Sequence, residues 1–158
     1  MNIKMNRRKS AEIRINAWII PIYIITLHEN INIVDGYKQK FHACNIKRYV
    51  QVLDLTDDPD MIREYKKWHS QEFHWKEIRD GIRAVGILEM EIYISGTRLV
   101  MIVDAPEDFD WQAAMDKLST LPRQAEWEAF VARLQGCDEN ARSDEKWKMM
   151  ERMFYLYD

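Results

Sequence analysis

The sequence predicts an α+β fold of the ferredoxin-like type, with its elements in the order βαββαβ. Residues 48–55 and 87–104 alternate apolar and polar side chains, which is typical of strands. The segments between and after them repeat apolar residues every three or four positions, as helices do. A chain of 158 residues that is 47% hydrophobic and 31% charged suits one globular core. Elements in this order form a four-stranded antiparallel sheet with helices on one face.

An acidic turn separates the first strand from the first helix. Residues 48–55 (RYVQVLDL) are rich in strand-forming residues and stop at that turn. Asp58 before Pro59 predicts a helix N-cap followed by a proline in the first helical position. Apolar and aromatic residues at helical spacing then extend to residue 73.

The middle of the chain predicts a second helix and a β-hairpin. The helix covers residues 75–85 and ends at Gly86, a residue that suits a helix C-terminus. Strands over residues 87–94 and 97–104 follow it, joined by the short Ser95–Gly96 link.

The last third of the chain predicts two further amphipathic helices and a fourth strand. The helices cover residues 109–118 and 123–134. Ser143 predicts the cap of a short helix, and the aromatic residues 153–157 (MFYLY) predict the strand. Because the second face of this sheet stays uncovered, we expect a two-fold homodimer that buries sheet against sheet.

Residues 1–46 differ in composition from residues 47–158. They hold 11 of the 18 isoleucines and a charge of +4, whereas the remainder has a charge of −7. We therefore expect a poorly ordered N-terminal extension over residues 1–46 and one α+β domain over residues 47–158. A targeting segment is an alternative, because basic residues precede the apolar run 17–27, although Pro21 interrupts that run. An upstream extension of the reading frame is another.

Charge and motif content exclude several functional classes. The formal net charge of −3 gives no support for a nucleic-acid partner, and the 11-residue apolar run is shorter than the roughly 20 residues of a membrane-spanning helix. The common cofactor and hydrolase motifs are absent and the histidines lack metal-ligand spacing, so we expect no cofactor and no metal. Cys44 and Cys137 do not form a secreted disulfide framework, which favours the cytoplasm.

Tyr65 and His69 are the strongest local candidates for chemistry. They lie four residues apart, and therefore on the same side of a helix. Imidazole exchanges protons near neutral pH, and a phenol can bind a sugar hydroxyl or orient the imidazole. A hydrogen-bonded packing pair explains the same spacing.

Further candidates follow on the second helix and the hairpin. Trp75 and Glu77 combine an aromatic surface with a carboxylate, a pair suited to a pyranose, although a core tryptophan beside a solvated charge has the same pattern. Glu89 and Glu91 share a strand face with Tyr93, and they lie either in a polar cleft or at a solvent edge.

Residues 47–158 resemble the L-rhamnose mutarotase family. The members of that family are small enzymes with a dimeric α+β barrel, and they interconvert the α and β anomers of a 6-deoxy-sugar. The resemblance rests on six segments: RYVQVLDL, REYKKWH (63–69), the Trp75-x-Glu77 pair, Gly86 before EIYISGTRLVMIVD, RQAEWEAF (123–130), and MFYLY.

The resemblance implies a role for several residues. His69 corresponds to the catalytic proton donor of the family and Tyr65 to a sugar contact. A strand tyrosine of the family falls on Met90, and a tandem tryptophan pair falls on Glu126 and Trp127. Two of the five contacts therefore differ here, which supports the reaction class more than the exact sugar.

Interconversion of anomers requires one proton removed from the anomeric hydroxyl and one delivered to the ring oxygen. We expect His69 to protonate the ring oxygen, with Tyr65 beside it and Trp75 and Trp127 as stacking surfaces. Water or a carboxylate would accept the other proton, the candidates being Glu89, Glu91 and Glu126. L-rhamnose is the expected substrate, and the reaction needs no cofactor.

Three alternatives stay open. L-fucose is the alternative substrate on the same scaffold. The scaffold also hosts ligand-binding modules and small oxygenases, and fold alone does not distinguish them from a mutarotase. Colour on purification or tight binding of an apolar ligand would favour those classes, whereas a mutarotase should be colourless.

Overall fold

The computed structural model describes residues 36–157. The chain divides into two compact units, residues 1–39 and 40–158, and all helices and strands given below lie in the second unit. The apolar run 17–27 lies outside the described residues. The proposed boundary after residue 46 stays a prediction.

Four antiparallel strands form one sheet. They are β1 (Ile46–Asp54), β2 (Glu89–Ser95), β3 (Arg98–Pro106) and β4 (Lys148–Met149), and their order across the sheet is β2-β3-β1-β4. This is the sheet order of a ferredoxin-like fold, so the predicted α+β class is confirmed.

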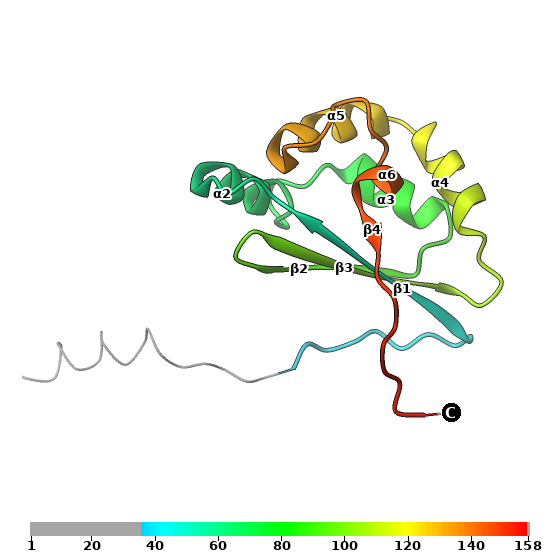
Figure 1. Cartoon of the computed structure of the whole chain (residues 1–158). Helices are drawn as coiled ribbons and strands as arrows, with labels where there is room; N and C mark the ends of the chain where they lie inside the picture. Colours follow the sequence, from blue (N-terminus) through cyan, green and yellow to red (C-terminus); the bar gives the residue numbers. More distant parts are fainter. Residues whose placement is uncertain (1–35, 158) are drawn as a thin grey trace, which may run out of the picture. The chain divides into compact units, whose positions relative to one another are not determined.

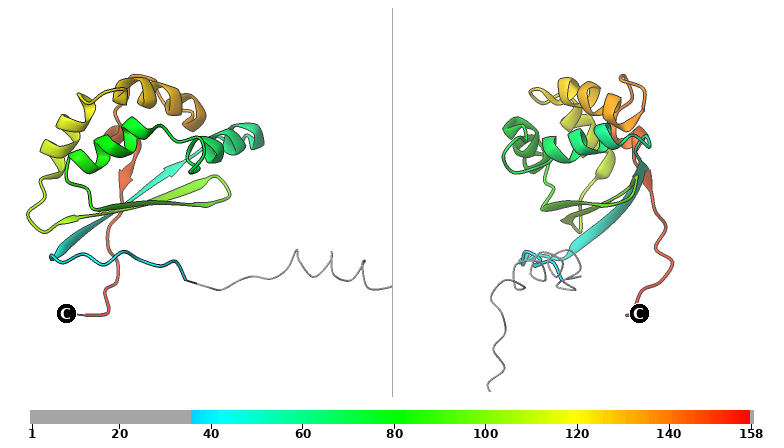
Figure 2. Two further views of the ribbon diagram at one scale, coloured as in Figure 1. Left: turned by 180° about the vertical axis from the view of Figure 1, so that it is seen from behind. Right: turned by 90° about the vertical axis from the view of Figure 1, so that its left-hand side faces the viewer.

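The helices cover one face of this sheet, as Figures 1 and 2 show. They are α2 (Pro59–Trp68), α3 (Lys76–Ala84), α4 (Trp111–Ser119), α5 (Gln124–Gln135) and α6 (Ser143–Lys146). Within residues 36–157, no helix is long and apolar enough to cross a membrane.

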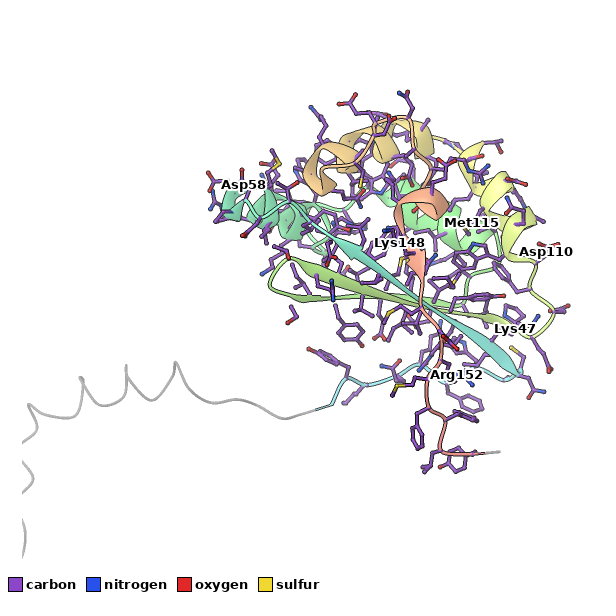
Figure 3. All side chains as sticks on the ribbon, in the orientation of Figure 1. Lys47, Asp58, Asp110, Met115, Lys148 and Arg152 are labelled. Carbon is purple, nitrogen blue, oxygen red and sulfur yellow. The ribbon has the colours of Figure 1, made fainter. Side chains whose placement is uncertain are left out.

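Aspartate caps begin two of these helices. The Asp58 carboxylate accepts hydrogen bonds from the backbone N–H groups of Asp60 and Met61 at 2.8 and 3.3 Å, which confirms the predicted N-cap of α2. Asp110 caps α4 in the same way through the N–H of Ala113. Figure 3 labels both aspartates at the starts of their helices.

Glycine ends α5 where another residue would clash. Gly136 has a φ of +66°, in the left-handed region that L side chains rarely adopt. A Cβ built there would also lie 2.2 Å from the hydroxyl oxygen of Thr56. The end of α5 therefore packs tightly against the turn that follows β1.

The core lies between the helices and the sheet. Strand alternation directs Leu99, Met101 and Val103 of β3 towards the helices, and all three are buried. Ala114 and Leu118 of α4 belong to the same buried set. This layer holds the helices over the face that forms the site.

Two expectations for the C-terminal region are wrong. The fourth strand is Lys148–Met149 instead of residues 153–157, because β4 pairs with Gln51 and Val52 and the later residues form no strand within the described part of the chain. Ser143 is the first residue of α6 and not its cap. Arg142 occupies the cap position, where its N–H donates to the Glu145 carboxylate at 2.8 Å.

Candidate active site

A cavity of about 510 Å³ lies on the helix side of the sheet. Its walls come from all five helices and from β1, β2 and β3. The volume falls within the range of small-molecule sites, and the walls mix aromatic, amide and charged side chains. The cavity can therefore hold a small polar ligand against an aromatic surface.

Tyr65 and His69 both line this cavity at the C-terminal end of α2. Their rings stack with centroids 4.0 Å apart, which is the contact that the four-residue spacing predicts. The Nδ1 atom of His69 lies 2.8 Å from the carbonyl oxygen of Tyr65. Because a carbonyl oxygen only accepts, Nδ1 carries the proton, and Nε2 is the ring nitrogen that can take a proton from a ligand or return it.

Burial sets the protonation of both residues. It lowers the pKa of His69 below its ordinary value of 6.5; the bond to the Tyr65 carbonyl acts in the opposite direction, and the Arg79 charge lowers the pKa further. Burial also raises the pKa of the Tyr65 phenol, against a lowering effect of its hydrogen bond with Gln135. At neutral pH the pair is therefore a neutral imidazole beside a neutral phenol.

Aromatic rings from α5 and from the residue before α3 extend the wall beyond His69. Trp127 meets the imidazole edge-on at 5.3 Å, and Trp75 lies 5.3 Å from Trp127. Phe130 stacks on Trp75 at 5.8 Å, and the Arg123 guanidinium lies 3.9 Å from the centroid of the Trp75 ring. Both tryptophans line the cavity, but Phe130 and Arg123 cover part of the Trp75 surface.

The two hairpin glutamates differ in position. Glu89 lies at the start of β2 and borders the cavity together with Met90, although strand alternation gives its side chain the same strand face as Glu91. Strand alternation and pairing with Ile102 place Glu91 on the face without helices, where its carboxylate accepts a hydrogen bond from the Tyr93 hydroxyl at 2.9 Å. Glu91 does not line the cavity.

Glu126 also lies outside the cavity wall. It is exposed on α5 and forms two hydrogen bonds with the Arg123 guanidinium, at 3.0 and 3.1 Å. These bonds hold the pKa of the Glu126 carboxyl below its ordinary value. Its neighbour Trp127 faces the cavity, because successive helical residues point in different directions.

Glu128 of the cavity wall forms a buried ion pair with Lys146, which lies behind the wall, and the sequence patterns did not predict this pair. Lys146 Nζ lies 2.5 Å from Glu128 Oε2, and the two side chains are only 1% and 15% exposed. Gln124 Nε2 donates to the other Glu128 oxygen at 2.8 Å. One stripe of α5 contains positions 124, 128, 131 and 135. Polar residues on this otherwise buried helix face are the sequence feature from which a polar cluster could have been predicted.

Two further polar residues in the wall were missed. Gln51 of β1 and Gln135 of α5 are 2% and 5% exposed and both line the cavity. Gln51 shares its strand face with Tyr49 and Leu53, so it is a polar residue in an apolar register. Within the described part of the chain, no group of three His, Cys, Asp or Glu side chains could hold a metal ion.

Comparison with known proteins identifies the family. The L-rhamnose mutarotase family matches residues 48–156. The chain belongs to this family. Mutarotases interconvert the anomers of a sugar, so membership supports an enzyme that acts on sugars, in agreement with the resemblance found in the sequence.

Relatives of this mutarotase-family chain carry different sugar names. An L-fucose mutarotase of Xanthomonas campestris pv. campestris is 37% identical over 112 residues, which are 71% of this chain and 90% of that protein. A UPF0734 protein of Dictyostelium discoideum is 37% identical over 94 residues, 59% of this chain and 74% of that protein. The crystal structure of an L-rhamnose mutarotase from Formosa agariphila matches with a TM-score of 0.51 and 19% identity, over 70% of this chain and 99% of that one, which supports the fold alone.

Proposed function

We propose that this protein is a mutarotase for a 6-deoxy-hexose, with L-rhamnose as the first candidate substrate. One observation carries the proposal: in a chain of the mutarotase family, His69 lines a cavity of mixed polar and aromatic character, with Nδ1 bound to a backbone carbonyl and Nε2 left for proton exchange. An imidazole that is fixed in one tautomer, with its second ring nitrogen facing the ligand, suits acid–base catalysis.

The ring opens by two proton transfers. Neutral His69 takes the proton of the anomeric hydroxyl on Nε2 while the bond between C1 and the ring oxygen breaks, and a second group protonates that oxygen. The product is an open-chain aldehyde. Rotation about the C1–C2 bond and the reverse transfers then close the ring to the other anomer.

This scheme changes the role expected for His69 from the sequence alone. The initial expectation was an acid that protonates the ring oxygen. The lowered pKa makes the neutral base the main form at pH 7, so removal of the anomeric proton comes first and the imidazolium formed then acts as the acid in ring closure.

A water molecule is the proposed second group, because this group must donate a proton to the ring oxygen and a carboxylate accepts one instead. A carboxylate at the cavity is proposed to orient that water. Of the three carboxylates expected from the sequence, Glu89 lines the cavity whereas Glu91 and Glu126 do not. Glu128 lines it too, but both of its carboxylate oxygens accept hydrogen bonds, from Lys146 and Gln124. We therefore assign Glu128 to positioning and not to proton transfer.

Tyr65, Trp127 and Trp75 are the proposed sugar contacts. A pyranose stacks its C–H face on an indole and presents hydroxyls at the rim, and Trp127 stands next to His69 where the anomeric carbon must lie. Met90 lines the cavity where the family resemblance implies a tyrosine, so one hydroxyl is missing from the wall.

L-fucose is the second candidate. A relative named for that sugar is 37% identical and is covered over 90% of its length. The differences at Met90 and Glu126 also remove part of the contact set that the resemblance implies for rhamnose. The two sugars differ in the orientation of ring hydroxyls. The positions of the hydrogen-bonding groups in the cavity therefore decide which of them binds better.

Exchange NMR on the purified protein tests the reaction. We expect magnetisation exchange between the α and β anomers above the spontaneous rate, faster for L-rhamnose than for L-fucose or D-glucose. Faster exchange for L-fucose would transfer the proposal to that sugar. If neither sugar exchanges above the spontaneous rate, or if the protein is coloured and binds an apolar ligand tightly, the mutarotase assignment fails.

We further propose that two copies associate through the face of the sheet that carries no helices. Strand alternation places Val50, Val52, Val100 and Ile102 on that face. The C-terminal segment extends on the same side in Figures 1 and 2, and residues 153–157 are at least 59% exposed although all five are large and apolar or aromatic. Exposed apolar surface of this kind is typical of an interface.

A reducing cytoplasm is the proposed compartment. Cys44 is exposed and Cys137 is half-buried, and both are free thiols. A small protein that folds without a disulfide does not need an oxidising compartment. Expression of a fluorescent fusion in the source cell would test this directly, and a signal from a secretory compartment would contradict it.

A further inference from the structure

Two buried amide oxygens in the cavity wall have no hydrogen-bond partner. They are the Oε1 atoms of Gln51 and Gln135, in side chains that are at least nine-tenths buried. A buried acceptor without a donor destabilises the folded state, and most such groups in proteins are paired. Each of the two therefore requires an explanation.

A third glutamine in the same wall shows the contrast. Gln124 is 5% exposed and lines the cavity like Gln51, yet its amide donates to Glu128 at 2.8 Å. The side chain of Gln135 also interacts with the Tyr65 phenol, whose pKa it lowers, but its Oε1 atom has no partner. In Gln51 and Gln135, then, the oxygen is the group that lacks a donor.

The chemistry of these oxygens selects the ligand. An amide oxygen accepts hydrogen bonds, so the ligand must supply donors. Sugar hydroxyls are donors, whereas an apolar ligand would leave both oxygens unsatisfied and an anion would be repelled by them. Gln51 belongs to the sheet and Gln135 to the helix layer, so the two reach a ligand from different walls.

We propose that Gln51 and Gln135 bind hydroxyl groups of the sugar and so determine which sugar the enzyme accepts. This inference rests on the proposed function and specifies the binding part of the same site. Amides do not titrate between pH 4 and pH 10, so both residues act in binding and not in proton transfer. Gln51 is the sharper test, because Gln135 also contacts Tyr65.

Substitution by methionine keeps the side-chain length and removes the acceptor. For Gln51→Met we expect the Kd and KM of the sugar to rise about 3- to 30-fold with kcat little changed, as for loss of one or two hydrogen bonds. The Tm of the free protein should stay the same or rise, because an unsatisfied buried acceptor is removed. Gln124→Met is the matched control in which Tm should fall, since its amide is already paired.

Deoxy-sugars locate the hydroxyl. Calorimetry would compare the Kd of L-rhamnose and L-fucose with those of their 2-deoxy, 3-deoxy and 4-deoxy forms. For one position, the deoxy form should bind the wild-type protein several-fold more weakly than the parent sugar, and Gln51→Met should bind both forms equally. Gln135→Met repeats the comparison independently should Gln51→Met fail to fold.

Two results overturn the proposal, and they can be told apart. If both methionine variants bind every sugar as the wild type does while anomer exchange persists, the amides serve internal water or packing, and the mutarotase assignment stands. A wild-type protein that neither binds nor interconverts any of these sugars removes the proposed function and this inference together.

Discussion

The imidazole of His69 donates its Nδ1 proton to the carbonyl oxygen of Tyr65, 2.8 Å away, while the two rings stack at 4.0 Å. The backbone of one helical turn therefore fixes the tautomer, and the stacked phenol limits rotation of the imidazole. No second side chain is needed to orient the histidine. Loss of His69 should consequently affect proton transfer much more than folding.

For His69→Ala we expect anomer exchange to fall by about 10² to 10⁴, because a positioned acid–base group contributes a factor of this size. Exchange NMR measures the rate and circular dichroism checks the fold. His42→Ala is the control, because His42 does not line the cavity, and it should exchange like the wild type. An early-melting His69→Ala protein with normal activity per folded molecule would assign His69 to packing alone.

Tyr65→Phe should have a milder effect. It keeps the stacked ring and removes only the hydroxyl, whose loss corresponds to about 1 kcal/mol of hydrogen bonding. The hydroxyl interacts with Gln135, so the measured change includes both a sugar contact and this internal bond. We expect a rate loss of roughly tenfold or less, and a loss as large as that of His69→Ala would show that the phenol itself transfers a proton.

The lowered pKa of His69 predicts two pH effects. The base form persists below the ordinary pKa of 6.5, so the exchange rate should decline only as the pH falls through the lower, folded-state value. Stability follows the same sign: the folded state resists protonation, so the stability present above pH 6.5 is lost as the pH falls from the unfolded to the folded pKa. Melting curves from pH 7 to pH 4 should show this loss in the wild type and less of it in His69→Ala.

Local sequence patterns predicted most of the helices and strands and the contact between Tyr65 and His69. Helical spacing brought Tyr65 and His69 together, and Asp58 and Gly86 marked the start of α2 and the end of α3. These features depend on residues that are close together in the chain, so they can be predicted from a single sequence. The same holds for the antiparallel hairpin, although its two turn residues are Gly96 and Thr97.

Long-range packing accounts for what the sequence did not predict. Lys146 meets Glu128 across 18 positions of the chain, and neither spacing nor composition fixes such a contact. The short β4 depends on which residues reach the edge of β1, so the aromatic character of residues 153–157 was misleading. Glu91 is a further example. Strand alternation predicted which residues share its face of β2, but it did not predict which face of the sheet the helices cover.

The ion pair of Lys146 and Glu128 gives a stability prediction. Lys146→Met should destabilise the fold by about 3–5 kcal/mol, because it leaves the Glu128 carboxylate buried without its cation. The double variant Lys146→Met with Glu128→Gln should recover part of that loss. Urea unfolding provides the free energies, with the exposed pair of Arg63 and Asp60 as the contrast. If Lys146→Met leaves the free energy of unfolding unchanged, the ion pair is solvated and not buried.

Two deletions test the proposed N-terminal boundary. Removal of residues 1–39 should leave folding and anomer exchange intact, because every helix and strand described lies beyond them. Removal of residues 1–46 also deletes Asn45 and Ile46, which hold Glu107 and Pro106 through backbone and side-chain contacts. We expect the shorter protein to fold with a lower Tm. Aggregation of both deletion proteins would show that the N-terminal region belongs to the core.

A charge placed on the helix-free face of the sheet tests the proposed homodimer. Val100 lies in the middle of β3 and pairs with Val52 of β1 and Tyr93 of β2, so its side chain stands near the centre of that face. Val100→Glu should yield monomers in light scattering after size exclusion, because an unpaired carboxylate in an apolar interface is strongly unfavourable. Gln112→Lys, at an exposed position of α4, should leave the oligomeric state unchanged.

The C-terminal segment provides the second arm of the same test. Removal of residues 151–158 deletes five exposed large side chains without touching β4 or the cavity wall, so the monomer fold should persist. If the segment packs against a second copy, the truncated protein should dissociate at concentrations where the full chain is dimeric. Dimers that survive both changes would place the interface elsewhere, and a wild-type protein that is monomeric at all concentrations would leave the exposed apolar segment to some other partner.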